Sequence, residues 1–153
     1  MRVLHIDFET SSKANIKDCG TYRYCADPST DVICLAYAFD DEPVRVTSYP
    51  TEEIFQHIAD GGLVYAHNAS MEEQILYHVY GVESVNMRCT SAVASYHALP
   101  ASLEAVADHL GLEVKKDREG AKILRKHFKT PTDDIPNEDY DVIVEYCRRD
   151  VEV

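Results

Sequence analysis

Two acidic residues separated by one position stand at the end of an apolar run near the N-terminus. The run is VLHIDFET, in which Asp7 and Glu9 flank Phe8. Side chains two residues apart in a β-strand point to the same face of the sheet, so these carboxylates would lie side by side. Adjacent negative charges at the end of a buried strand repel each other unless a cation, usually a divalent metal ion, lies between them. The pattern therefore predicts a metal site; the alternative is a solvated strand end.

Two later segments place further acidic side chains where they can join the first pair. In AHNASMEEQIL, a predicted strand ends at His67 and a helix follows, so Glu72 would lie in its first turn, close to the end of the first strand. In YCRRD, Tyr146 and Asp150 are four residues apart and would share one face of a helix. A phenol and two more carboxylates would thus point toward the same site.

Carboxylates from three separate elements can bind two Mg²⁺ or Mn²⁺ ions, because these hard cations take oxygen ligands. The candidate ligands are Asp7, Glu9, Glu72 and Asp150. Two such ions about 3.5–4 Å apart stabilise both the attacking and the leaving oxygen of a phosphoryl displacement. The hydroxyl of Tyr146 would orient the attacking water. These residue types therefore predict metal-dependent hydrolysis of phosphodiester bonds.

Histidine and cysteine offer no comparable site. The seven histidines form no HxxxH or HExxH spacing, and none of the five cysteines belongs to a CxxC pair. A zinc enzyme is therefore disfavoured, and the cysteines are expected to be reduced thiols. We expect Cys147, which follows Tyr146, to be a small core residue.

The elements that would position these residues are mainly strands in the first half of the chain and helices in the second. Apolar runs predict strands at residues 2–8, 32–39, 43–49, 63–67 and 86–90. Three helices are expected in the middle of the chain: from Thr51 to Gly61, from the Asn68–Ala69 junction to Gly81, and after residue 90 with its end at Leu99. Three more are expected from Ser102 to Gly111, across residues 115–129, and from an N-cap at Asn137 through YCRRD. This order predicts one α/β domain over residues 1–153, with a mixed sheet of three antiparallel strands and parallel additions, flanked by helices.

One predicted helix concentrates positive charge in a chain that is acidic overall. The net charge of −12 argues by itself against a nucleic-acid partner, because phosphate contacts need Lys and Arg. Seven of the fifteen basic residues nevertheless lie between positions 115 and 129: Lys115, Lys116, Arg118, Lys122, Arg125, Lys126 and Lys129. Their helical spacing predicts one basic face, which either contacts nucleic acid or is simply solvated.

The motifs DFET, HNASMEE and YCRRD, in this order, resemble those of the DEDD superfamily of 3'-to-5' exonucleases, in the subclass with Tyr in its third motif. GTYRYCADPSTDVICLAYAFDDEPV and RCTSAVASYHALPASLEAVADHLGL resemble the proofreading exonuclease region of phage and prophage family A DNA polymerases. The resemblance implies an RNase H-like fold. It implies metal ligation by Asp7, Glu9, Glu72 and Asp150, water positioning by Tyr146, and contacts from Thr10 and Asn68 to the 3' end of the substrate strand.

Two features depart from the family pattern. The usual second motif has Asp where this chain has Glu72, and the additional methylene moves the carboxylate by roughly the length of a bond. The neighbouring Glu73 would point about 100° away on the same helix. The chain also ends three residues after Asp150, without the polymerase part that follows in the family. We therefore expect either a fragment, with a family A polymerase domain in the natural context, or a small free-standing exonuclease.

The leading prediction is a two-metal 3'-to-5' exodeoxyribonuclease that acts on a single-stranded or frayed DNA end, as in proofreading. The alternatives are a 3'-to-5' exoribonuclease of the RNase D type, which has the same Tyr-type motif, and a catalytically impaired nucleic-acid-binding module. No signal sequence begins the chain, and no apolar stretch approaches the length of a membrane span. We therefore expect a cytoplasmic protein of a bacterium or a phage-infected cell.

Overall fold

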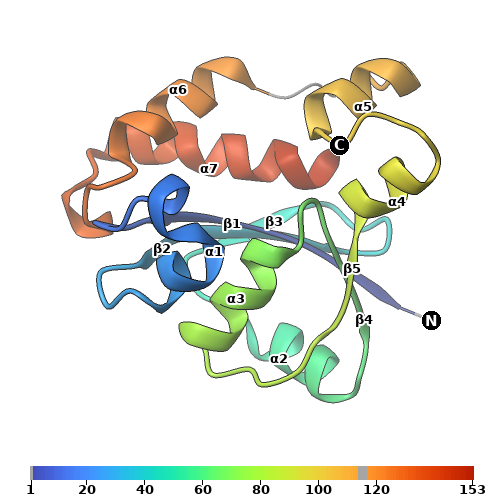
Figure 1. Ribbon diagram of the computed structural model, residues 1–153, viewed down its shortest axis with the longest axis horizontal. Coiled ribbons are helices and arrows are strands. Elements are labelled where there is room, and N and C mark those ends of the chain that lie inside the picture. The colour runs from blue at the N-terminus through green and yellow to red at the C-terminus, as the bar shows by residue number, and fades with distance from the viewer. Residues whose placement is uncertain (1, 114–116) are drawn as a thin grey trace.

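Five strands form one mixed sheet in the computed structural model, which describes residues 2–113 and 117–153 (Figure 1). The strands are β1 (Val3–Ser11), β2 (Asp31–Phe39), β3 (Arg45–Thr47), β4 (Leu63–Ala66) and β5 (Asn86–Cys89), in the spatial order β3-β2-β1-β4-β5. β1, β2 and β3 pair antiparallel, whereas β4 is parallel to β1 and β5 is parallel to β4. The predicted arrangement of three antiparallel strands with parallel additions is confirmed.

Helices cover both faces of this sheet (Figure 1). One layer contains α1 (Ile16–Ala26), α2 (Glu52–Ala59) and α3 (Ser70–His78). The opposite layer contains α6 (Arg118–His127) and α7 (Asn137–Glu152). The remaining helices are α4 (Thr90–Tyr96), α5 (Leu103–Leu110) and the short 3₁₀ helix η1 (Thr132–Asp134). None of the helices within the described ranges is long and apolar enough to cross a membrane.

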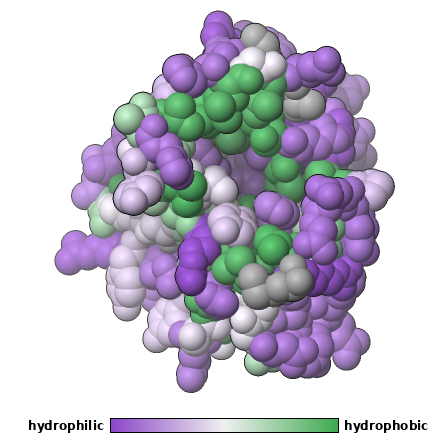
Figure 2. Space-filling view, turned by 90° about the vertical axis from the view of Figure 1, so that its right-hand side faces the viewer, coloured by the Kyte–Doolittle hydropathy of each residue, from purple (hydrophilic) through white to green (hydrophobic). Residues whose placement is uncertain are grey.

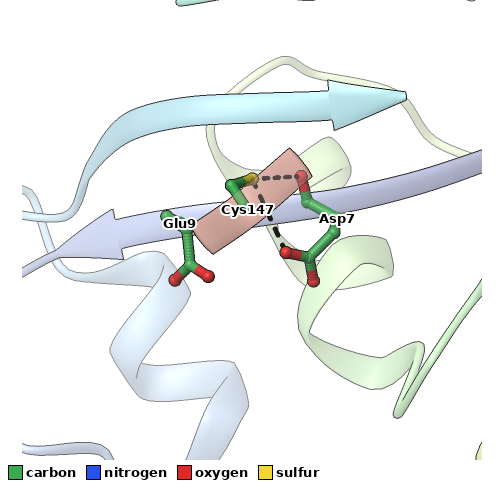
Figure 3. Close-up of side chains that lie close together, drawn as sticks. All are labelled: Asp7, Glu9 and Cys147. Atoms are coloured by element: carbon green, nitrogen blue, oxygen red, sulfur yellow. Dashed lines mark hydrogen bonds between the residues drawn. The ribbon is translucent and has the colours of Figure 1, made fainter. Parts of the chain in front are cut away.

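Strand β1 lies between two hydrophobic cores. Leu4, Ile6 and Phe8 alternate along it and pack with the layer that contains α3. The intervening residues, including Asp7 and Glu9, face α7 (Figure 3). The neighbouring strand β2 is apolar on both faces because each face is covered by a helical layer, and its Cys34 and Ala36 pack against α7.

The capping residues of the helices agree in part with prediction. Ser102 caps α5 by accepting a hydrogen bond from the Ala105 N–H at 3.3 Å, and Gly111 ends that helix in the left-handed conformation with φ of 67°. Asn137 was expected to be the N-cap of α7, but Pro136 holds that position with extended backbone and Asn137 is already helical. The expectation is wrong because the helix begins one residue earlier: Pro136, with a φ of −58° and no N–H to leave unpaired, suits the position just before the first turn.

Helix α1 was not predicted. Its eleven residues, IKDCGTYRYCA, have no continuous apolar stripe, and Gly20 interrupts the helix with a φ of 76°. Two lysines of the predicted basic helix, Lys115 and Lys116, lie outside the described residues; the helix observed there, α6, begins at Arg118.

Candidate metal centre

The carboxylates of Asp7 and Glu9 lie side by side on β1, as the spacing predicts (Figure 3). One oxygen from each and the sulfur of Cys147 all lie within 4.8 Å of one another. The parallel pairing with β4 covers only residues 3–5 of β1, and the antiparallel pairing with β2 shifts register between Glu9 and Thr10. The two carboxylates therefore stand beyond the part of β1 that pairs with β4.

Cys147 is a fully buried residue of the core, as expected, but it also contacts the acidic pair. Its sulfur lies 3.4 Å from the Asp7 carbonyl oxygen and 3.6 Å from Asp7 Oδ2 (Figure 3). A hydrogen bond with Cys34, burial and the negative charge of Asp7 raise the pKa of the Cys147 thiol well above its usual value. The thiol therefore stays protonated and donates to Asp7, rather than acting as a thiolate ligand.

Glu72 reaches the same place from the other layer of the fold. It lies in the first turn of α3 with only 3% of its surface exposed, whereas Glu73 is exposed and points away, as predicted. Burial and the charge of Asp7 raise the pKa of the Glu72 carboxyl well above its usual value, although hydrogen bonds from its own N–H and that of Phe8 oppose the shift. Among the described residues, Glu72 Oε2 has no hydrogen-bond partner. A buried, unpartnered carboxylate oxygen beside a second carboxylate fits a divalent cation, which would relieve both penalties.

Tyr146 and Asp150 approach the acidic pair from α7. Tyr146 is 5% exposed, and its phenol and the Asp150 carboxylate are joined by a hydrogen bond. Burial raises the pKa of the Tyr146 hydroxyl far above its usual value, and the charges of Glu9, Asp150 and Asp7 add to the shift. The phenol is therefore neutral in the metal-free protein and can donate a hydrogen bond. The structure thus places Glu72 beside Asp7, and it links Asp150 to the acidic pair through Tyr146. That these residues hold metal ions together stays a prediction.

The two residues predicted to contact substrate lie next to elements that carry the acidic residues. Thr10 follows Glu9 on β1, and its hydroxyl is 2.9 Å from the Tyr24 hydroxyl. Asn68 is exposed in the turn between β4 and α3, where its φ is 62°. A contact from either side chain to a substrate strand stays a prediction.

Two cavities adjoin the cluster on the side of α7. The larger, of about 680 Å³, is lined by Asp150 and by apolar side chains that include Val93, Leu103 and Leu110. Figure 2 shows hydrophobic residues gathered around a hollow on this side of the molecule. The smaller, of about 420 Å³, is lined by Tyr146 and by side chains of α5 and α6. Both have the size of ordinary small-ligand sites.

Replacing Glu72 with glutamine should stabilise the metal-free protein at neutral pH. The unfolded chain releases the Glu72 proton near the usual pKa of 4.5 and the folded chain only at higher pH, so the wild type loses stability as the pH rises above that value. In EDTA, the melting temperature of Glu72→Gln should exceed that of the wild type at pH 8, by about 2–4 °C for each kcal/mol relieved, and the difference should shrink at pH 5.

The exposed neighbour Glu73 provides the matched control. Glu73→Gln removes the same charge from the same helical turn, and its melting temperature should follow that of the wild type at both pH values. Added Mn²⁺ should stabilise the wild type more than Glu72→Gln. A wild type that gains stability between pH 5 and pH 8 would contradict the raised pKa.

Comparisons with known proteins show what the chain resembles in sequence and in fold. No protein-family model matches the chain. A curated "DNA polymerase" of Bacillus phage SP02 is 29% identical over 174 aligned positions, which cover 100% of this chain. The chain spans only 27% of the length of that relative.

Two solved structures share the fold. One is described as the "apo form of the nuclease", with a TM-score of 0.61 and 16% identity over 97% of this chain and 66% of that one. The other is the family B DNA polymerase of the archaeon Pyrobaculum calidifontis, with a TM-score of 0.51 and 14% identity over 99% of this chain and 23% of that one. The chain therefore has an RNase H-like α/β fold, and along its whole length it resembles one part of a phage DNA polymerase.

Proposed function

We propose that this protein is a metal-dependent 3'-to-5' exonuclease that hydrolyses phosphodiester bonds at a single-stranded or frayed 3' end of DNA. The observation that carries the proposal is the acidic pair on β1, which interacts with the buried Glu72 of α3 on one side and with Tyr146 of α7, the hydrogen-bond partner of Asp150, on the other. The similarity to a phage DNA polymerase and the fold shared with a nuclease support it. In this proposal the natural role is proofreading, with a polymerase as the functional partner.

The chain's own residues would divide the work as follows. Asp7, Glu9, Glu72 and Asp150 would hold two divalent ions, Mg²⁺ or Mn²⁺, which when bound supply Lewis-acid stabilisation of the reacting phosphate. The Cys147 thiol holds the Asp7 carboxylate by a hydrogen bond. The neutral Tyr146 phenol donates a hydrogen bond to Asp150. The lone pairs of the Tyr146 oxygen are then available to accept a hydrogen bond from an attacking water. Thr10 and Asn68 would contact the terminal nucleotide.

Tyr146→Phe should slow cleavage by about 10-fold to 100-fold without abolishing it. The substitution removes only the hydroxyl that orients the water, whereas the acidic groups remain. The expected signature is a lower kcat with an unchanged requirement for metal. Tyr140→Phe, on the same helix but outside the cluster, is the matched control and should behave like the wild type. Equal rates for both variants would remove Tyr146 from the mechanism.

The direct test is incubation of the protein with matched 5'-labelled single-stranded DNA and RNA, in Mg²⁺, Mn²⁺ or EDTA. A ladder of DNA products that shorten one nucleotide at a time, only with metal, supports the proposal. A 3'-labelled copy should release labelled mononucleotide from the first turnover, which fixes the direction. Faster shortening of RNA would favour the RNase D-type alternative. Binding of either strand without cleavage in any metal would favour an impaired binding module.

A further inference from the structure

The basic side chains of α6 lie in two different environments. Lys126 forms an ion pair with Asp139 of α7 at 2.8 Å, away from the acidic cluster. Arg118 and Arg125, seven residues or about two turns apart, instead line the smaller cavity together with Tyr146. Two guanidinium groups therefore open onto the same space as the proposed water-positioning residue.

The walls of this cavity combine charge with apolar surface. Besides the two arginines and Tyr146, it is lined by Ser102, Leu103, Glu104, Ala121 and Leu124. A guanidinium presents a planar fork of N–H donors that matches phosphate oxygens, and aliphatic side chains suit the sugar and base of a nucleotide. The lining thus has the chemistry of a nucleotide backbone site rather than of a site for a free metal ion.

The existing partners of the two arginines leave them accessible to an anion. Arg118 donates from Nε and Nη2 to Glu104 Oε1 at 2.9 and 2.5 Å, so a carboxylate already occupies its fork. The Arg118 side chain is 85% exposed, and an exposed pair of this kind contributes little stability. Arg125 donates from Nε to the Ala121 carbonyl of its own helix, and no carboxylate pairs with it among the residues in the described ranges. An incoming phosphate would displace one weak ion pair.

We propose that the cavity between α5, α6 and α7 binds an internucleotide phosphate of the single-stranded substrate, next to the bond that is cut, through Arg125 and Arg118. This inference rests on the proposed nuclease function and adds a specific contact to it. The phosphate replaces the Glu104 carboxylate as the partner of Arg118. Until the strand binds, Glu104 keeps the Arg118 side chain in place at the cavity. The two arginines thereby give this strongly acidic protein a local positively charged site for a polyanionic strand.

Arg125→Ala and Lys126→Ala provide a matched pair, because both remove one positive charge from adjacent positions of α6. Binding of a 5'-labelled single-stranded DNA should be measured by fluorescence anisotropy, over a range of salt concentrations, in a background that carries Asp7→Ala to prevent cleavage. Arg125→Ala should weaken binding about tenfold, the size of one charge-assisted hydrogen bond, and should reduce the salt slope by about 0.7 to 1. Lys126→Ala should change neither quantity.

Kinetic measurements with two substrates show whether the cavity binds a neighbouring phosphate of the strand or the phosphate that reacts. In the wild-type background, Arg125→Ala should raise the KM for an oligonucleotide about tenfold, and much less for the p-nitrophenyl ester of thymidine 5'-monophosphate, which has a single phosphate. If Arg125→Ala raised the KM equally for both substrates, or weakened inhibition by thymidine monophosphate by the same factor, the cavity would bind the product nucleotide. Either result would overturn the proposal. Equal effects of the two variants on binding would also overturn it.

The same experiments distinguish this inference from the proposed function. Absence of metal-dependent cleavage by the wild type counts against the exonuclease, whatever the arginines do. Cleavage by the wild type with unaltered binding in Arg125→Ala counts against the phosphate site alone.

Discussion

Asp7→Ala should reduce metal-dependent cleavage by about 10³-fold or more. Asp7 lies at the centre of the cluster, where it neighbours Glu9, Glu72, Tyr146 and Cys147. A bound divalent ion contributes several kcal/mol to stabilising a phosphoryl transition state, and each 1.4 kcal/mol corresponds to about tenfold in rate. The measurement is the single-turnover rate on single-stranded DNA in saturating Mg²⁺ or Mn²⁺.

The same variant should fold as well as the wild type. Removal of one of several crowded negative charges relieves repulsion in the metal-free protein, so its melting temperature in EDTA should be equal or higher. Asp141→Asn, an exposed acid on α7, is the control for a change in charge alone and should retain full activity. Full activity in a folded Asp7→Ala protein would rule out the two-metal mechanism.

Gly120→Ala should lower kcat by about 100-fold, although Gly120 has no chemistry of its own. A Cβ at this position would lie 2.7 Å from Tyr146 Cβ and 2.9 Å from Oδ2 of Asp117, the residue that caps α6. Both distances are shorter than van der Waals contact, so α6 must shift or Tyr146 must move. A displacement of about 1 Å in a positioning group costs about two orders of magnitude in rate. Overpacking should also reduce the free energy of unfolding by about 1–3 kcal/mol.

Gly62→Ala separates the effect on the site from the loss of stability. Its Cβ would meet the ring of His57 on α2, a helix that carries none of the acidic site residues, and this ring can turn away more easily than Tyr146 Cβ can move. The two variants should be compared at a temperature where thermal scans show both to be folded. Gly62→Ala should then retain a near wild-type kcat. A Gly120→Ala enzyme with the same kcat as Gly62→Ala would show that the close approach of α6 to Tyr146 is purely structural.

Local rules predicted those parts of the fold that depend on a few consecutive residues. The period of two along β1 placed Asp7 and Glu9 together, and the Ser102 and Gly111 caps bounded α5 correctly. Helix α1 was not predicted, because no apolar stripe marks it and its stability comes from packing against the β1 and α3 layer. Local rules contain no information about such a partner.

The candidate site could be predicted as a set of residues but not as a geometry. The contact between Cys147 and Asp7 joins residues 140 positions apart, and it depends on how α7 packs against β1. Its only signal in the sequence is that Cys147 lies three residues before Asp150 and so shares its helix face. The need for a glycine at position 120 likewise appears only once α6 and α7 are packed together.

The acidic groups come from both sides of the sheet, since α3 lies in one layer and α7 in the other (Figure 1). Neither layer alone assembles the cluster. Because the ribosome makes α7 after every other element described here, a nascent chain lacks Tyr146 and Asp150 until its sheet and first layer are complete. In the proposed function, a chain that lacks α7 therefore lacks two of the groups needed for cleavage, and activity would require both helical layers to be in place.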